Sequence, residues 1–217
     1  MEVYTVQPNG TDGFDTDILS AAPDTNEGTQ DKMGIMRYAA DNLQHGLIKF
    51  DISPIPTNVR VFDAWISLFV ATDYANNSAI LSAYRILRNW TQAGATWNKY
   101  DGTNVWGTAG ALNATDIDLT IGSWGSFTTT SSEATHAEKK LHLSKWQMTK
   151  MINGVYTNYG WMLKTNEASD QDGYNWHSSN YATLIYCPKL TILYELPYHN
   201  AYRGRQRTCG NADPRIP

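Results

Sequence analysis

The sequence predicts an all-β domain, an antiparallel jelly-roll β-sandwich with one short helix and an irregular C-terminal tail. Three observations predict it: short runs of alternating apolar and polar residues, turns rich in Gly, Asn, Asp and Pro between these runs, and a length of 217 residues. All-β sandwiches of about 200 to 250 residues commonly form one domain. A chain of this size needs no metal or disulfide to fold, because it buries roughly 70% of its unfolded surface.

Seven strands are expected, and two of them show the clearest alternation. Every second side chain in residues 47–52 is apolar, which is typical of a half-buried strand. Residues 64–70 carry large apolar groups on both faces, with Ala64, Ile66, Leu68 and Val70 on one of them. The other strands are expected at residues 81–87, 117–121, 140–143, 159–164 and 189–196.

Residues 144–154 predict the helix. Ser144 can cap its first turn and Gly154 can end it. The apolar side chains at helical spacing are Met148, Met151 and Ile152. We expect these side chains to cover an open end of the sandwich.

The end of the chain differs in composition from the jelly roll of residues 1–197. Residues 198–217 contain one acid and four arginines, which are Arg203, Arg205, Arg207 and Arg215. This segment has no apolar periodicity, so alone it should be disordered. The sequence therefore predicts a basic tail that docks onto a protein partner.

Several functional classes are disfavoured by composition and motif content. A net charge of −4 at pH 7 is not typical of a nucleic-acid-binding protein, and no apolar run approaches the roughly 18 residues of a membrane span. The N-terminus does not look like a secretory signal. Cys187 and Cys209 lack the spacing of a zinc site or disulfide scaffold, which favours free thiols.

No catalytic motif occurs in the chain, so we expect no enzymatic activity. The five histidines are scattered singly. Most acids, Asp15 among them, are expected to lie solvated in polar loops, where their pKa would not be raised. A glycosidase pair of facing carboxyl groups would leave no motif, so a hydrolase or lyase stays a third, weaker alternative.

The chain offers one candidate metal site. Asp15, Asp17, Asp24 and Asn26 carry hard oxygen ligands within one segment, which suggests bound Ca²⁺, although no cofactor is required. The alternative is that Asp24 and Asn26 form turns through bonds to nearby amides.

Aromatic residues provide a candidate carbohydrate-binding site, since aromatic faces stack on sugars. The candidate platform residues, read as lying in loops, are Trp106, Trp124, Tyr174 and Trp176. Lys49, Arg85 and Arg88 are candidates to hold a carboxylate or sulfate of an acidic glycan. The alternative is that the rings pack in the core and the cations are simply solvated.

Five landmarks in order resemble the DNRLRE-domain proteins, a group that includes carbohydrate-binding module family ninety-six. They are residues 15–18 with 23–29, residues 47–56, residues 64–70 with 84–86, residues 90–98, and the helix with residues 158–164 and 187–192. The resemblance implies an antiparallel jelly roll without catalytic machinery, and some members bind acidic polysaccharides. His45 and Lys49 stand where the family usually carries Arg or often carries Arg, respectively.

Two main hypotheses follow. In the first, the protein is a virion component, such as a capsid decoration, head fibre or tail protein, anchored by its tail and exposing a glycan-binding face. Its location would be the virion or the extracellular surface, without a signal peptide. In the second, it is a carbohydrate-binding module of a secreted polysaccharide-degrading enzyme. The second hypothesis explains the family resemblance and the aromatic residues but gives the tail no role.

Overall fold

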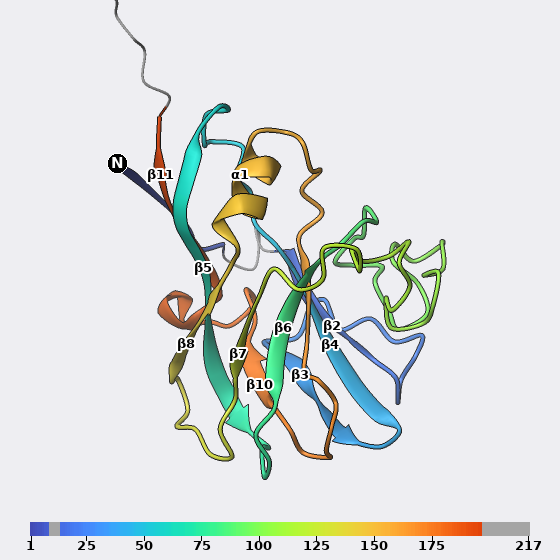
Figure 1. Ribbon diagram of the computed structural model, residues 1–217. Helices are drawn as coiled ribbons and strands as arrows, with labels where there is room; N and C mark the ends of the chain where they lie inside the picture. Colours follow the sequence, from blue (N-terminus) through green and yellow to red (C-terminus); the bar gives the residue numbers. More distant parts are fainter. Residues whose placement is uncertain (9–13, 197–217) are drawn as a thin grey trace, which may run out of the picture.

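The computed structural model describes residues 1–8 and 14–196, and it confirms the predicted all-β fold with one short α-helix. The strands are β1 (Glu2–Val6), β2 (Phe14–Leu19), β3 (Lys32–Ala39), β4 (Asn42–Lys49), β5 (Arg60–Asp73), β6 (Ile80–Arg85), β7 (Gly125–Thr128), β8 (Glu138–His142), β9 (Trp161–Lys164), β10 (Tyr174–His177) and β11 (Lys189–Glu195). They pair antiparallel in the order β1-β11-β5-β10-β3-β4-β9-β6-β7, with β2 on β4 and β8 on β5. The sheet curls into two layers (Figure 1), and β10 joins them by pairing with both β3 and β5.

The main core lies between the two layers. Ala64, Ile66, Leu68 and Val70 of β5 point into it, as the alternation predicts. Ile48 and Phe50 enter from the other layer, which confirms the inward face predicted for residues 47–52. Phe69, on the outer face of β5, is also buried, because Tyr186 packs edge-on against its ring. The outer face of β5 is therefore partly covered.

Helix α1 (Lys145–Ile152) lies at one end of the sandwich, beside the start of β5 (Figure 1). Its three predicted apolar side chains are buried, and Thr149 Oγ1 accepts a hydrogen bond from Val61 N at 3.1 Å. Gly154, at φ 77°, follows the helix end. Ser144 precedes the helix but makes no side-chain capping bond. In the described part of the chain, no helix combines the length and apolar character of a membrane span.

A second apolar cluster, which we call the loop cluster, covers the outside of β2, β4 and β9. Most of it comes from the long connection between β6 and β7, drawn in green at the side of the sheet (Figure 1). Trp90, Trp97 and Trp106 of this connection pack with Ile18 and Leu47. The half-buried assignment of residues 47–52 is thus incomplete, because Leu47 is buried on the opposite face.

The strand predicted at residues 117–121 is wrong. Ile117 forms a single bridge with Ile86, and its side chain belongs to the loop cluster. Asp118 instead accepts a hydrogen bond from Ile121 N at 3.1 Å, which closes a turn. Irregular backbone is tolerated here because these local bonds satisfy its polar groups.

Two sequence-based predictions concern residues beyond the described ranges. The basic tail with its four arginines lies there, as does Cys209, so docking by the tail stays a prediction. Cys187 is buried and free, and burial raises the pKa of its thiol to about 11.

Candidate functional site

Strands β2 and β4 form a ribbon with two unlike faces. Ile18 lies opposite His45 in the register, and both point to the covered face, against the loop cluster. Leu19 lies opposite Gln44, and both point to the other side, which we call the open face. Because side chains alternate along a strand, one face of the ribbon packs against the loop cluster. The open face packs in the main core at Ile48 and lines a groove near Gln44.

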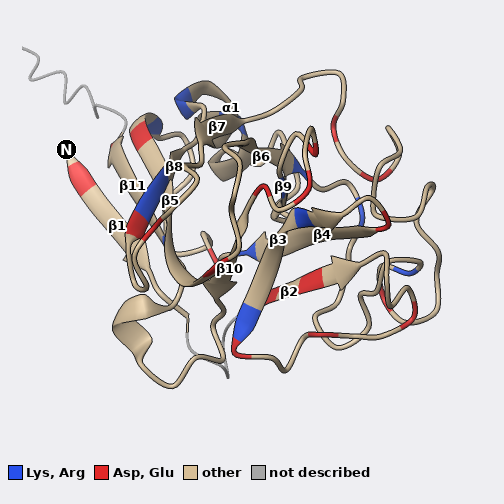
Figure 2. Cartoon of the chain, turned by 90° about the horizontal axis from the view of Figure 1, so that it is seen from below, with Lys and Arg blue, Asp and Glu red and all other residues tan. Residues whose placement is uncertain are grey.

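The open face forms one wall of a groove of about 490 Å³, and β3 lies across from it. Three carboxylates line this groove, from Asp17, Glu27 and Asp31. Four amide side chains also line it, from Gln30, Asn42, Gln44 and Asn175. Figure 2 shows the acidic positions on β2 and on the connection from β2 to β3. The groove is therefore rich in hydrogen-bonding groups and predominantly acidic.

Gly34 of β3 allows the groove its depth. A Cβ at this position would overlap Gln44 Oε1 and approach Asp17 Oδ2 to 2.9 Å. With glycine there, Asp17 Oδ2 accepts a hydrogen bond from Gly34 N at 2.8 Å. The missing side chain lets a carboxylate and an amide lie directly over the backbone of β3.

Asp17 and its neighbour Asp15 are buried strand residues, which corrects the interpretation of Asp15 as a solvated loop acid. Burial raises the pKa of Asp17 to about 7, and the negative charge of Glu27 adds to this shift. Burial likewise raises the pKa of Asp15 to about 6, although Ser179 donates to it from N and Oγ at 2.8 and 2.9 Å. Asp15 is thus buried and hydrogen-bonded to Ser179, whereas Asp17 lines the groove.

Two tyrosines stand at the rim of the groove. Tyr38, near the end of β3, and Tyr74, just after β5, are 40% and 39% exposed. Their ring centroids lie 5.7 Å apart in an edge-to-face arrangement. Each ring therefore keeps surface available for stacking on a ligand. The sequence-based selection missed both rings.

The four aromatic residues predicted as a platform are core residues instead. Trp124 packs edge-on against Trp161 in the main core, and Trp106 lies in the loop cluster, donating from Nε1 to Thr96 O at 2.9 Å. Tyr174 and Trp176 belong to β10, not to a loop, and both are fully buried. None of these rings offers a face to solvent, because all four residues are at most 3% exposed.

The three predicted cations lie apart from the groove. Lys49 sits 4.4 Å above the ring of Phe14, and burial lowers the pKa of its ammonium group. Arg85 pairs with Asp118 at 2.7 Å, and Arg88 pairs with Asp116 at 3.3 Å. The two arginines already hold carboxylates of the protein, so neither is presented to a ligand as a free cation.

The four residues predicted to bind Ca²⁺ are engaged in separate contacts. Asp24 Oδ1 accepts from Asn98 at 3.1 Å, and Asn26 Nδ2 donates to Gln92 O and Ala95 O, both at 2.7 Å. Asn26 Oδ1 also accepts from Gly28 N, as the turn alternative predicts. Across residues 1–8 and 14–196, no group of three or more His, Cys, Asp or Glu side chains is placed to hold a metal ion. Bound Ca²⁺ stays a prediction.

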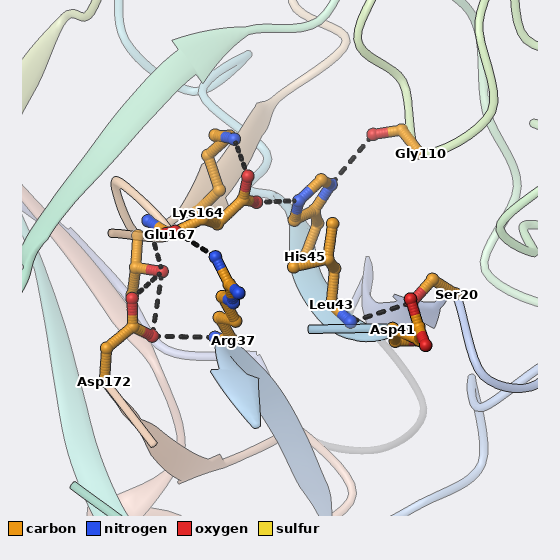
Figure 3. Close-up of polar contacts among 10 residues, drawn as sticks. Ser20, Arg37, Asp41, Leu43, His45, Gly110, Lys164, Glu167 and Asp172 are labelled. Atoms are coloured by element: carbon orange, nitrogen blue, oxygen red, sulfur yellow. Dashed lines mark hydrogen bonds and ion pairs between the residues drawn. The ribbon is translucent and has the colours of Figure 1, made fainter. Parts of the chain in front are cut away.

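A buried polar network ties the covered face to the loop after β9 (Figure 3). His45 Nδ1 lies 2.8 Å from Gly110 O, and its Nε2 lies 2.6 Å from Glu167 Oε1. Lys164 Nζ contacts the second oxygen of Glu167 at 2.8 Å. Burial alone would raise the pKa of Glu167, but His45 and Lys164 hold it at about 2. His45 thus contacts a backbone carbonyl on one side and a carboxylate on the other.

His136 and His177 meet in space, which their separation in sequence does not indicate. His136 Nδ1 and His177 Nε2 lie 2.9 Å apart, with ring planes 18° apart. This spacing fits an in-plane hydrogen bond and leaves no room for an ion between the nitrogens. Burial and the neighbouring His136 lower the pKa of His177 to about 4. We assign this pair a packing role.

A comparison with known families identifies one relation. The model of carbohydrate-binding module family 96 matches residues 11–118, just under half of the chain. The matched segment includes strands β2 to β6 and most of the groove wall. No curated protein sequence matches the chain. The family match supports a carbohydrate-binding module, a class without catalytic activity of its own, whereas membership of the wider DNRLRE group stays a prediction.

Proposed function

We propose that this protein is a non-catalytic carbohydrate-binding module that holds a glycan in the groove between β2, β3 and β4. The observation that carries the proposal is the pair of exposed rings, Tyr38 and Tyr74, at the rim of a groove lined by amides and carboxylates. Both tyrosines also lie inside the segment that the family match covers.

The groove has the two kinds of group that sugar binding requires. Aromatic faces stack against the C–H faces of a pyranose, and they lose little conformational entropy on binding. Amide and carboxylate side chains accept from or donate to neighbouring hydroxyls and so fix the orientation of the sugar. Gln44 and Asn42 are joined by a hydrogen bond of 3.2 Å, which holds Gln44 in place before a ligand arrives.

The proposal is tested by replacing the two rings together. We expect Tyr38→Ala/Tyr74→Ala to raise the dissociation constant for the best glycan of an array by at least about tenfold, measured by isothermal titration calorimetry. The free energy of unfolding should fall by no more than about 2 kcal/mol, because both rings are only partly buried.

Trp146→Ala provides the matched control. Trp146 lies on α1, outside the groove, and is 67% exposed. This variant should bind like the wild type. Equal binding by the double variant and the wild type, or an array without any bound glycan, would contradict the proposal.

Of the two sequence-based hypotheses, the family match supports the carbohydrate-binding module better than the virion component. Anchoring in a virion depends on the arginines of the tail, which lie outside the described residues. That hypothesis stays a prediction.

A further inference from the structure

We propose that a pocket between α1 and the start of β5 docks an acidic segment of a partner protein, which inserts an apolar side chain between the cations of the pocket. The pocket has a volume of about 300 Å³ and is lined by Arg60, Val61, Phe62, Lys145, Trp146 and Thr149. None of these residues lines the glycan groove. The inference therefore goes beyond the proposed function and does not depend on it.

The exposed rings of the pocket are the first argument. Trp146 is 67% exposed, whereas every other tryptophan in the described ranges is buried or partly buried. Lys150 Nζ lies 5.3 Å from the centre of the Trp146 ring, and the Arg60 guanidinium lies 5.1 Å from the centre of the Phe62 ring. These cation–π contacts orient both rings before a partner arrives. Tryptophan and arginine are also the residues that most often dominate the energy of a protein interface.

The charge of the pocket is the second argument. Arg60, Lys145 and Lys150 take part in no ion pair within 4 Å with another described residue. Glu195 lies opposite Arg60 in the β5–β11 register, but the two side chains do not meet within that distance. Asp63, the first acid of β5, already contacts a histidine of β8 at 3.1 Å. These three cations therefore favour carboxylates brought by a partner.

The hydrogen-bonding groups of the pocket favour a protein segment over a glycan. Apart from the indole N–H of Trp146, the Thr149 hydroxyl is the only uncharged polar side-chain group among the lining residues. This hydroxyl donates to Lys145 O at 2.8 Å and accepts from Val61 N at 3.1 Å. A pyranose would therefore bury hydroxyl groups with few partners, which is costly. An aliphatic or aromatic side chain has no such requirement, and acids beside it on the same segment would meet the cations.

The pocket lies where the chain leaves the sandwich. β11 ends beside the start of β5, at the same end of the molecule as α1 (Figure 1). Residues 198–217, which follow β11 in sequence, contain four arginines and one acid. Their net charge has the same sign as that of the pocket, which disfavours the tail itself as the occupant. An acidic protein surface is complementary to both.

The test measures the binding of synthetic polymers to the whole chain by biolayer interferometry at neutral pH and low ionic strength. A random copolymer of glutamate and tyrosine presents rings among carboxylates, and polyglutamate of equal length presents carboxylates alone. We expect the copolymer to bind at least about tenfold more tightly than polyglutamate, because only the copolymer can fill the apolar part of the pocket. Binding should weaken in about 0.5 M salt, because ions screen charges near the surface.

Two variants and one control locate the binding. Trp146→Ala and Arg60→Gln/Lys145→Gln should each weaken copolymer binding by at least about fivefold. All three residues are exposed, so the variants should fold normally. Lys99→Gln/Lys140→Gln removes the same charge from the connection between β6 and β7 and from β8. This control should bind the copolymer within about twofold of the wild type, because neither lysine lines the pocket.

Three results would refute the docking pocket. The first is no binding of the copolymer, and the second is equal binding of the two polymers. The third is copolymer binding that survives Trp146→Ala, because other cations of the chain would then hold the polymer.

Two further probes distinguish other classes of ligand. Vesicles of phosphatidylserine and phosphatidylcholine, and a polyuronate, are measured with the same variants. If either binds more tightly than the copolymer and loses binding in Trp146→Ala, the pocket serves a membrane or a glycan and the proposal is wrong. The glycan groove is tested separately by Tyr38→Ala/Tyr74→Ala, so failure of one proposal leaves the other standing.

Discussion

The two faces of the β2–β4 ribbon differ in what covers them. On the covered face, Ile18 and Leu47 lie under Trp90 and Trp97, which come from a connection that begins about forty residues after β4. The open face packs in the main core at Ile48, and toward the other end of the ribbon Asp17 lines a groove. Alternation along a strand therefore specifies two faces, but the segments that pack on each face decide which positions become core and which line a groove.

The largest effect is expected on the covered face. Trp90 is buried, and its Nε1 donates to Tyr159 O at 2.7 Å. Trp90→Ala should lower the free energy of unfolding by about 3 to 5 kcal/mol, measured by urea denaturation, because it removes a large ring from a packed cluster. A loss below about 1 kcal/mol would mean that packing of Trp90 in the loop cluster contributes little to stability.

The network beneath that cover should give an intermediate, pH-dependent effect. The pKa of Glu167 is about 2 when folded, against an ordinary value of 4.5, so its stabilising contribution is present above pH 4.5 and lost as the pH falls toward 2. Glu167→Gln should cost about 2 kcal/mol at pH 7, since it weakens charge-assisted hydrogen bonds to His45 and Lys164.

Urea denaturation at pH 7 and pH 3 tests this prediction. The difference in the free energy of unfolding between Glu167→Gln and the wild type should be smaller at pH 3 than at pH 7. A difference independent of pH would show that the carboxylate charge of Glu167 contributes nothing.

The smallest effect on stability is expected on the open face, where a substitution should stabilise the protein rather than destabilise it. Burial raises the pKa of Asp17 to about 7, so the folded chain binds more protons than the unfolded chain between about pH 4 and pH 7. The contribution of this residue to stability therefore falls as the pH rises through that window. Asp17→Asn should be more stable than the wild type by roughly 1 to 2 kcal/mol at pH 8 and should show no gain at pH 4.

Thermal unfolding of both proteins across this range provides the measurement. If Asp17→Asn is less stable than the wild type at pH 8, Asp17 is stabilised as a carboxylate in the free protein. The hydrogen bond from Gly34 N would then compensate for the burial of that carboxylate.

Local patterning was sufficient to predict some elements of the fold. The inward faces of β4 and β5 and the buried face of α1 follow from apolar spacing. Strand β2 was missed because Asp15 and Asp17 resemble loop acids, although both are buried on one face of a strand. The buried acids are satisfied by Ser179 and Gly34, which are remote in sequence.

The site was predicted less well than the fold, for a physical reason. Whether an aromatic ring is exposed depends on long-range packing, so the sequence did not distinguish buried Trp106 and Trp176 from exposed Tyr38 and Tyr74. The groove also draws on five separate stretches of chain, and no periodic pattern connects them.

Because Gly34 has no side chain, a single substitution at this position would change the depth of the groove. Gly34 is an ordinary strand position without a positive φ, so the backbone tolerates a side chain there. Alanine, serine and valine would raise the floor in steps and crowd Gln44 and Asp17 progressively. The dependence of ligand affinity on side-chain size in this series would report how closely a bound ligand approaches β3.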